Sequence, residues 1–169
     1  MKSFVGVIAL VMLVSPVLAQ GSIYTSTQGT ACRDMGSQSA LNIWRCPGPA
    51  GYAVEFTDEG NVAGVAIGRS ADRRKFGHPI SWRGAERVFG DKLEWRLMNG
   101  VPAAAILRIW RVSTDREGTD RTVQELLVMR LSPQGTCQVQ AVDVRQINAN
   151  ETAQQLADTG TCVISEQLD

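Results

Sequence analysis

The residue types best suited to binding chemistry gather in one segment, Arg69–Arg87. This segment holds six lysine and arginine residues against two acidic ones, which leaves a net charge of +4, and aromatic side chains are interleaved with the cations. Guanidinium groups bind phosphates and carboxylates, and an indole face stacks on a sugar or a base. We therefore predict a surface that binds an anionic glycan or a protein partner. Its predicted members are Arg73, Arg74, Lys75, His78, Trp82 and Arg83.

A second interpretation treats the same segment as a plain connecting loop. Runs of charge commonly serve only to keep a loop solvated, and the phenylalanine and tryptophan of this loop would then pack into the core. The acidic C-terminal region would neutralise the loop, since no basic residue follows Arg145. The sequence leaves both interpretations open. The acidic residues concerned are Glu151, Asp158, Glu166 and Asp169.

Catalysis has weaker support in the sequence. His78 is the only histidine, no serine stands in a G-x-S-x-G turn, and the cysteines are expected to be oxidised, so the imidazole lacks a nucleophile to activate. Glu55, Asp58 and Glu59 would suit glycoside hydrolysis only if two of them faced each other across a cleft, and Asp58-Glu59-Gly60 is better explained as a turn. No phosphate-binding glycine loop or H-E-x-x-H motif occurs. We therefore assign no catalytic residue and expect no cofactor and no metal.

The cysteine pattern favours disulfides over a zinc site. The chain has four cysteines, no C-x-x-C pair and one histidine, which fits no four-ligand zinc spacing. Four cysteines allow three pairings. We favour Cys32–Cys46 with Cys137–Cys162, because each bond closes a local loop at one end of the chain. By loop entropy each bond would stabilise the fold by about 3 kcal/mol.

Residues 1–19 have the pattern of an export signal. Lys2 precedes an uncharged apolar run, Phe4–Val14, and Val17-Leu18-Ala19 supplies small or compact residues before a cleavage site after Ala19. The run is shorter than the ~20 residues that span a bilayer, and the first cysteine, Cys32, is too distant to carry a lipid. We expect release into the periplasm or the medium, without a membrane span or a lipid anchor. A buried N-terminal helix is less favoured, because the run has no polar face.

Size and charge indicate one ordinary domain. Without the export signal the chain has about 150 residues, the length of a single domain. Seventeen lysine and arginine residues balance 17 aspartate and glutamate residues, and 44% of the residues are apolar. This balance argues against a protein that binds nucleic acid generally, and the apolar share allows a packed core. We expect a loosely structured arm over residues 20–40 and a β-rich domain over residues 41–169.

Short alternating and apolar runs predict a mainly β fold, an antiparallel meander sheet or a partly closed barrel. Leu41–Cys46 ends at Pro47-Gly48-Pro49, and the turn Asp58-Glu59-Gly60-Asn61 joins a strand around Val54 to Val62–Gly68. The later predicted strands are Lys92–Leu97, Ala103–Val112, Arg121–Leu131 and Cys137–Val144. Among the tryptophans, we expect Trp82 to be exposed and three to lie in the core, namely Trp44, Trp95 and Trp110.

The clearest hairpin surrounds Asn99-Gly100. This pair supplies the two positive-φ positions of a type I′ turn. In the register of a two-residue loop, Arg108 and Trp110 share the face of Trp95, which would place one guanidinium among apolar neighbours. The predicted facing pairs are Leu97 with Pro102, Trp95 with Ala104, and Leu93 with Ile106.

One short C-terminal α-helix is predicted near residues 149–158. Asn148 and Glu151 have the spacing of a capping box, and Gly160 fits a C-terminal stop. Ala149, Ala153, Leu156 and Ala157 form a narrow stripe that would allow the helix to lie close against the sheet.

Several short stretches carry a resemblance that covers most of the exported chain: W-R-C-P-G at 44–48, E-W-R-L-M-N-G-V-P at 94–102, A-I-L-R-I-W at 105–110 and Q-L-A-D at 155–158. In these the chain resembles a family of small exported proteins of alphaproteobacteria with no assigned function. The resemblance implies a periplasmic setting. We expect a non-enzymatic binding or accessory module whose partner is an envelope protein or an anionic glycan. The alternatives are a protein inhibitor of an envelope-degrading enzyme, with a protruding loop, and a small hydrolase.

Overall fold

The computed structural model describes residues 20–38, 40–69, 76, 79–132 and 135–163, so the predicted export signal lies outside the described residues. This part of the chain contains nine strands, one α-helix and two short 3-10 turns, Gly29–Ala31 and Pro49–Gly51. The helix, α1, spans Ala149–Thr159. The strands are β1 (Gln20–Ser26), β2 (Arg33–Gln38), β3 (Leu41–Pro47), β4 (Ala53–Asp58), β5 (Val62–Gly68), β6 (Ile80–Met98), β7 (Val101–Thr114), β8 (Asp120–Ser132) and β9 (Gly135–Asp143).

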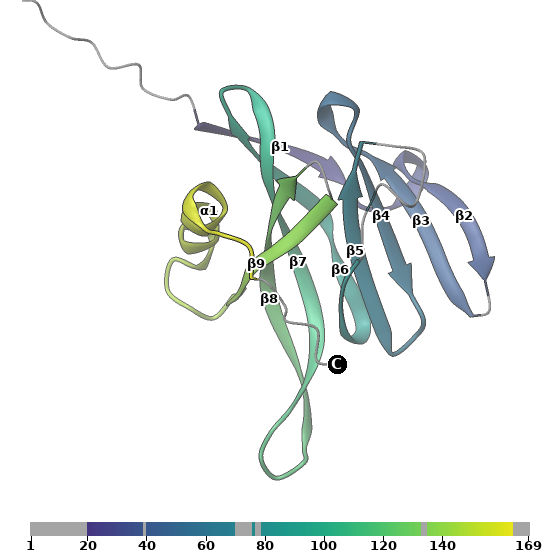
Figure 1. Cartoon of the computed structure of the whole chain (residues 1–169). Coiled ribbons are helices and arrows are strands. Elements are labelled where there is room, and N and C mark those ends of the chain that lie inside the picture. Colours follow the sequence, from purple (N-terminus) through teal and green to yellow (C-terminus); the bar gives the residue numbers. More distant parts are fainter. Residues whose placement is uncertain (1–19, 39, 70–75, 77–78, 133–134, 164–169) are drawn as a thin grey trace, which may run out of the picture.

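The strands form one antiparallel sheet in which neighbours along the chain are neighbours in space (Figure 1). The path runs from β2 to β9 in sequence order, and β1 pairs with β6 outside this path. Within the described residues β2 and β9 do not pair, so the sheet is not closed into a barrel. The predicted mainly β meander with one C-terminal helix is confirmed.

The core lies between the two halves of this sheet. β6 belongs to both halves, because its beginning pairs with β5 and the remainder pairs with β7. Phe56 and Ile67 of the first half form one buried cluster with Trp95 and Leu107 of the second. Alternation along each strand points these side chains inward and their neighbours outward.

Two disulfides fasten the ends of the described chain to the sheet. Cys32–Cys46 joins the segment before β2 to β3, and Cys137–Cys162 joins β9 to the segment after α1. Both predicted pairings are confirmed, and all four cysteines are bonded. Disulfides persist in oxidising compartments and are rare in the cytosol, so the bonds indicate a non-cytoplasmic protein.

The turn between β6 and β7 is as predicted. Asn99 and Gly100 have φ angles of 53° and 76°, the left-handed values that a type I′ turn requires. Leu97 faces Pro102, as a two-residue loop demands.

Beyond the turn the predicted register is wrong by one residue. A shift between Arg96 and Leu97 leaves Ala103 as an extra residue on β7. One extra residue turns every later side chain of that strand to the opposite face. Arg108 therefore lies on the face that α1 covers, where it lines a hollow with residues of the helix, and not beside Trp95. The observed pairs are Trp95 with Ala105 and Leu93 with Leu107, in place of Ala104 and Ile106.

The prediction of a loosely structured arm over residues 20–40 is wrong. β1 pairs antiparallel with Lys92–Met98 of β6, and β2 pairs with β3. The segment lacks an apolar period because edge strands are held by their backbone hydrogen bonds while many side chains stay in solvent. Ile23 and Tyr24, for example, are 37% and 58% exposed.

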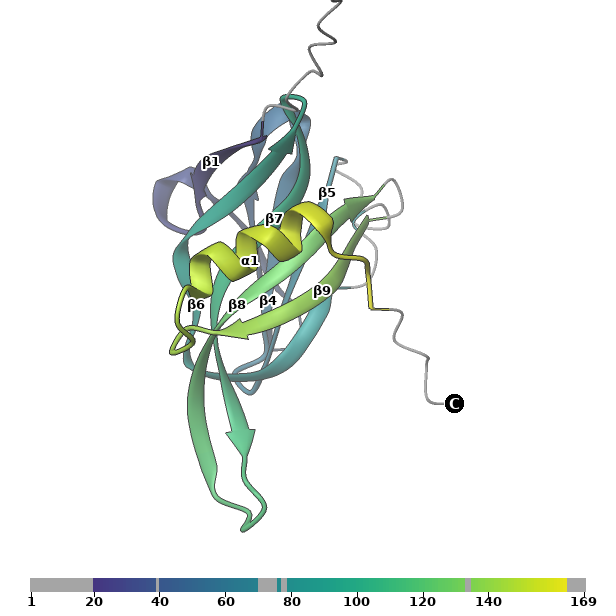
Figure 2. The ribbon, with the colours of Figure 1, turned by 90° about the vertical axis from the view of Figure 1, so that its left-hand side faces the viewer.

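Helix α1 lies across the outer face of β6–β9 (Figure 2). The predicted capping box is wrong: Asn148 has a left-handed φ of 59° and its side chain makes no cap bond. Gly160 ends the helix as predicted, in an extended conformation, and a Cβ there would collide with Val139 Cγ1 and with the carbonyl oxygen of Leu156. No helix in the described ranges is long and apolar enough to cross a membrane. The buried stripe consists of Ala149, Ala153 and Ala157.

Candidate functional site

The structure describes only part of the predicted basic surface. Four predicted members lie outside the described residues, so their binding role stays a prediction. Phe76 of the same segment is buried, and the guanidinium carbon of Arg45 lies 4.5 Å from its ring centre. This phenylalanine packs inward, as the connecting-loop interpretation expects. The four residues outside the description are Arg73, Arg74, Lys75 and His78.

The other two predicted members lie in β6, which begins at Ile80, so the segment ends as a strand and not as a loop. Trp82 is partly buried, and its predicted exposure is wrong. Its Nε1 donates a hydrogen bond to the backbone oxygen of Trp110 at 3.3 Å, and its ring meets Phe89 edge-on at 5.5 Å between centres. Alternation along the strand turns Trp82 inward and the next residue, Arg83, outward.

Arg83 is neutralised by the hairpin that joins β7 to β8. Its two terminal nitrogens donate to the two carboxylate oxygens of Asp120 at 3.2 and 2.6 Å. The hydroxyl of Thr114 and this guanidinium lower the pKa of Asp120. Arg83 is therefore paired with a carboxylate of the hairpin.

The three carboxylates considered for hydrolysis have separate roles. Glu55 is buried, and its Oε2 accepts a hydrogen bond from Nη2 of Arg45 at 2.7 Å. Asp58 accepts the backbone N–H of Gly60 at 2.7 Å, which confirms the predicted turn, and Glu59 is exposed on that turn. Glu55 and Asp58 also occupy positions of opposite parity on β4, so they point to opposite faces.

A groove opens beside the middle of β6, between the part of that strand that pairs with β5 and the part that pairs with β1. β6 pairs with β5 as far as Arg83 and with β1 from Lys92 onward, so no described strand lies beside residues 84–91 on that edge. The cavity left there has a volume of about 500 Å³. This volume lies in the range of small-molecule sites. We call it the Trp44 groove, after the tryptophan in its wall.

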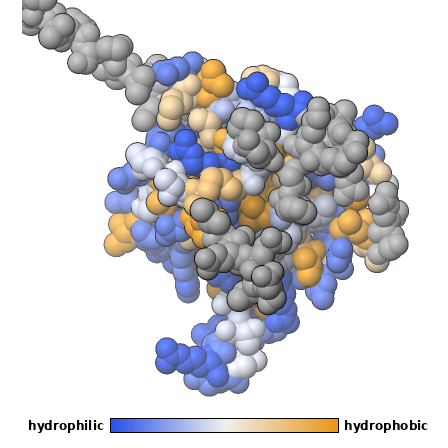
Figure 3. All heavy atoms as spheres, viewed as in Figure 1, coloured by the Kyte–Doolittle hydropathy of each residue, from blue (hydrophilic) through white to orange (hydrophobic). Residues whose placement is uncertain are grey.

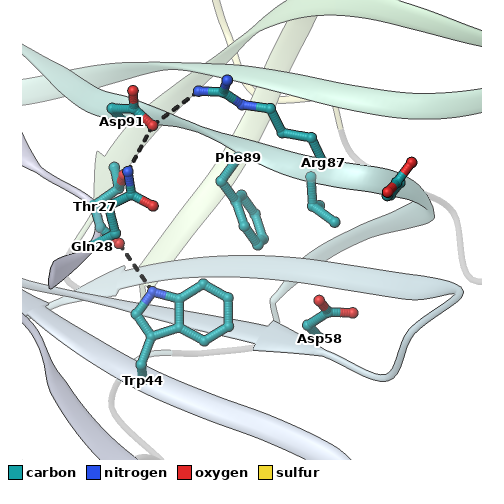
Figure 4. A pocket seen from close by; sticks show the side chains of 9 residues that line it. Thr27, Gln28, Trp44, Asp58, Arg87, Phe89 and Asp91 are labelled. Carbon is teal, nitrogen blue, oxygen red and sulfur yellow. Dashed lines mark hydrogen bonds and ion pairs between the residues drawn. The ribbon is translucent and has the colours of Figure 1, made fainter.

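The floor of the Trp44 groove is aromatic. Trp44, from β3, packs edge-on against Phe89 of β6 at 5.6 Å and stacks on Phe56 of β4 at 5.3 Å between ring centres. Its Nε1 donates to the backbone oxygen of Thr27 at 3.0 Å, which fixes the indole (Figure 4). Trp44 is thus partly buried at the edge of the core, with part of its surface left for the groove.

The rim of the Trp44 groove is polar and organised around Asp91 (Figure 4). Its Oδ1 accepts hydrogen bonds from Nε2 of Gln28 at 2.8 Å and from Nη2 of Arg87 at 2.9 Å. Asp58 and Glu86 line the same cavity. The arrangement offers hydrogen-bond acceptors and donors at fixed positions beside the aromatic floor.

A second hollow of about 470 Å³ adjoins the first and shares Gln28 and Trp44 with it. It adds Asp34 and Asn42 to the lining. Together the two hollows carry four carboxylates, those of Asp34, Asp58, Glu86 and Asp91, against the single guanidinium of Arg87. The groove is therefore acidic, opposite in sign to the basic surface predicted from the sequence.

Arg87 also lies over the ring of Trp110, with its guanidinium carbon 4.7 Å from the ring centre. Trp110 is half-buried there, so its predicted place in the core is wrong. The register shift on β7 accounts for this, because it turns Trp110 away from the face of Trp95.

Among the residues that the structure describes, no group of three or more histidine, cysteine, aspartate or glutamate side chains is arranged to hold a metal ion. Comparisons with protein-family models, with curated proteins and with solved structures found no match for the chain.

Proposed function

We propose that the chain is an exported, non-enzymatic binding module of the bacterial cell envelope, and that it binds its ligand in the Trp44 groove. The single observation that carries the proposal is an aromatic floor beside a rim of hydrogen-bonding groups, in a cavity of about 500 Å³. The two disulfides support an oxidising compartment. A periplasmic address after cleavage near Ala19 is part of the proposal.

The ligand class that fits best is a saccharide unit. The apolar face of a sugar ring packs on an aromatic side chain, and its hydroxyl groups donate to carboxylate and amide oxygens. The groove supplies both through Trp44, Gln28 and Asp91. Its acidic lining favours a neutral or amine-bearing saccharide over an anionic one, because a like charge near the carboxylates is repelled.

Titration with three soluble oligosaccharides tests the proposal. The probes are a neutral oligomer of N-acetylglucosamine, its amine-bearing glucosamine counterpart and a polyuronate. We expect the first two to bind and to change the tryptophan fluorescence, and the polyuronate to bind more weakly. Glu86→Gln should weaken the amine-bearing probe about tenfold, the effect of one charge-assisted hydrogen bond.

Glu117→Gln is the matched control, because Glu117 is an exposed carboxylate on the distant β7–β8 hairpin. It should leave the affinity for each oligosaccharide unchanged. Trp44→Phe should weaken both bound probes, with folding checked by circular dichroism. If no probe binds, or if Glu86→Gln and Trp44→Phe both bind as the wild type does, the groove is not the binding site.

A second function, inhibition of an envelope-degrading enzyme, is favoured by one observation. The β7–β8 hairpin projects far beyond the body of the molecule (Figures 1 and 2), and its tip is mainly hydrophilic (Figure 3). The tip is held rigidly: Oδ1 of Asp115 accepts the backbone N–H groups of Glu117 and Thr119 at 3.1 and 2.8 Å, and its Oδ2 accepts from Arg121 at 2.9 Å. A rigid loop binds at a lower entropy cost than a flexible one.

Lysis of a peptidoglycan suspension by a lysozyme-type enzyme tests this second function. An inhibitory hairpin should slow lysis at equimolar protein, and replacing Arg116 and Glu117 at the tip by alanine should remove the effect. Glu86→Gln, in the groove, should retain it. Lysis at the uninhibited rate with the wild-type protein would reject an inhibitor of this enzyme class.

A further inference from the structure

A small hollow lies between α1 and the sheet, separate from the Trp44 groove in all its lining residues. Its volume is about 190 Å³, roughly that of six water molecules. Its lining residues come from β1, β6, β7, β8 and α1. Figure 2 shows α1 lying across this side of the sheet. Ile106, Leu126 and Ala153 give it an apolar wall, and the other lining residues carry polar groups at its edge.

Two cations line this hollow. Lys92 comes from β6 and Arg108 from β7, next to the register shift between Phe89 and Leu93. Like charges that share one small cavity repel each other, and an anion bound between them would offset this repulsion.

No carboxylate of the described chain neutralises this pair. Arg108 is half-buried and has no hydrogen-bond or ion-pair partner among the described residues. Glu94 is the one acidic residue in the lining, and its Oε1 already accepts from Ser22 at 2.6 Å and from Gln154 at 2.9 Å. Glu94 also lies 3.6 Å from a guanidinium nitrogen of Arg96. The nitrogen atoms of Arg108 remain accessible to solvent, so an anion that enters the hollow can reach them.

Two further polar groups complete the lining. Burial, the charge of Glu94 and a hydrogen bond to that carboxylate raise the pKa of Tyr24. The Asn150 side chain supplies an amide. The hollow thus combines two positive charges with one carboxylate, that of Glu94, whose Oε1 already has two donors, and with the amide of Asn150. The space is too small for an extended ligand.

We propose that this hollow binds a small anion with a carboxylate or phosphate group, held mainly by Arg108 and Lys92. The site is independent of the proposed saccharide groove. The apolar wall suits a short-chain carboxylate, and the two cations suit a phosphate. The experiment below therefore compares these two kinds of anion.

Titration of the full exported chain with acetate and with inorganic phosphate, against sodium chloride at equal ionic strength, tests the site. Amide NMR shifts should occur at residues that line the hollow, with one probe or with both, and not with chloride. Arg108→Gln and Lys92→Gln should each weaken binding about tenfold or more, as expected for loss of a charged hydrogen bond. Arg145→Gln, which removes an exposed guanidinium elsewhere, should leave the shifts unchanged.

Thermal unfolding separates an anion site from a structural arginine. The bound probe should raise the Tm of the wild type and not that of Arg108→Gln. Without added anion, Arg108→Gln should keep or raise the Tm, because it removes the repulsion from Lys92. The proposal is overturned if neither probe shifts these residues, if chloride acts equally, or if Arg108→Gln lowers the Tm and binds as the wild type does.

Discussion

An ion pair between Arg96 of β6 and Asp158 of α1 joins the helix to the sheet. Removing either partner measures how much this contact stabilises the fold. Nε and Nη2 of Arg96 donate to the two carboxylate oxygens of Asp158 at 3.0 and 2.7 Å, and Nη1 donates to the hydroxyl of Ser22 at 2.6 Å. The two charged side chains are only 12% and 14% exposed. We predict that Arg96→Met destabilises the protein more than Asp158→Asn does.

The asymmetry follows from what each variant leaves behind. Breaking a fully buried ion pair costs about 3–5 kcal/mol, and the partial exposure of this pair reduces the cost of Arg96→Met to about 2–3 kcal/mol. That variant leaves Asp158 and Glu94 close together without a cation. Asp158→Asn keeps a hydrogen-bond acceptor, and Arg96 retains Glu94 at 3.6 Å, so about 1–2 kcal/mol is expected.

Urea denaturation followed by circular dichroism measures both values, and the double variant gives the coupling energy of the pair. The matched control is Arg145→Met, because Arg145 pairs with Asp143 at the same 2.7 Å while being 79% exposed. That control should leave the urea midpoint nearly unchanged, because an exposed ion pair is screened by solvent. A cost below about 1 kcal/mol for Arg96→Met, or a coupling energy near zero, would refute the claim that this pair anchors the helix.

Two further predictions concern packing and pH. Gly48→Ala should lower the free energy of unfolding in urea by about 1–3 kcal/mol, because a Cβ there would lie 2.5 Å from Cζ2 of buried Trp95. Gly21→Ala is the control and should be close to neutral, because the atom nearest to its Cβ lies 4.0 Å away. Equal urea midpoints for the two variants would contradict this prediction. The neighbouring guanidinium lowers the pKa of Asp143 from 3.8 to about 2, so its stabilisation is complete above pH ~4 and is lost as the pH falls through ~2. Because solvent screens this exposed pair, Asp143→Asn should flatten the dependence of Tm on pH only slightly in that window, and a steeper slope would contradict the pairing.

The features that the sequence predicted correctly depend on short-range signals. The cysteines of the two disulfides are separated by 14 and 25 residues. The Asn99-Gly100 turn needs only two positive φ angles, and the alanine stripe of α1 follows the period of a single helix. Each signal is contained in one stretch of chain, so it can be recognised without knowledge of the neighbouring strands.

The missed strands depend on partners far along the chain. Gln20–Ser26 becomes a strand because Lys92–Met98 offers it a free edge, and its polar composition reveals nothing of this. The Trp44 groove was missed for the same reason. Its lining comes from β3, β4, β6 and the segment after β1, and the groove exists only because β6 is left without a neighbour over residues 84–91. No local pattern marks such a gap.

The register of the β6–β7 hairpin, by contrast, could have been predicted from the sequence. Two sequence signals, the turn residues and the apolar pattern of the strands, require different registers. The Asn99-Gly100 turn pairs odd positions of one strand with even positions of the other. Burial requires the opposite: the inward residues of β6 near the turn, Leu93 and Trp95, have odd numbers. The buried residues Leu107 and Ile109 of β7, which are 0% and 2% exposed, also have odd numbers. Keeping the turn register throughout would bury the guanidinium of Arg108 and expose the side chains of Leu107 and Ile109. Exposing each aliphatic side chain costs about 1.5–3 kcal/mol.

A single extra residue resolves the conflict. It pairs odd positions of β6 with odd positions of β7 and leaves the turn unchanged. The structure places that residue at Ala103, between the pairs Leu97–Pro102 and Arg96–Ala104. The same bulge that returns Leu107 to the core turns Arg108 outward, where it lines the hollow beneath α1 together with Lys92. The proposed anion site is thus a consequence of how the hairpin reconciles its turn with its core, and it could be sought in any β-hairpin whose turn and apolar pattern disagree in parity.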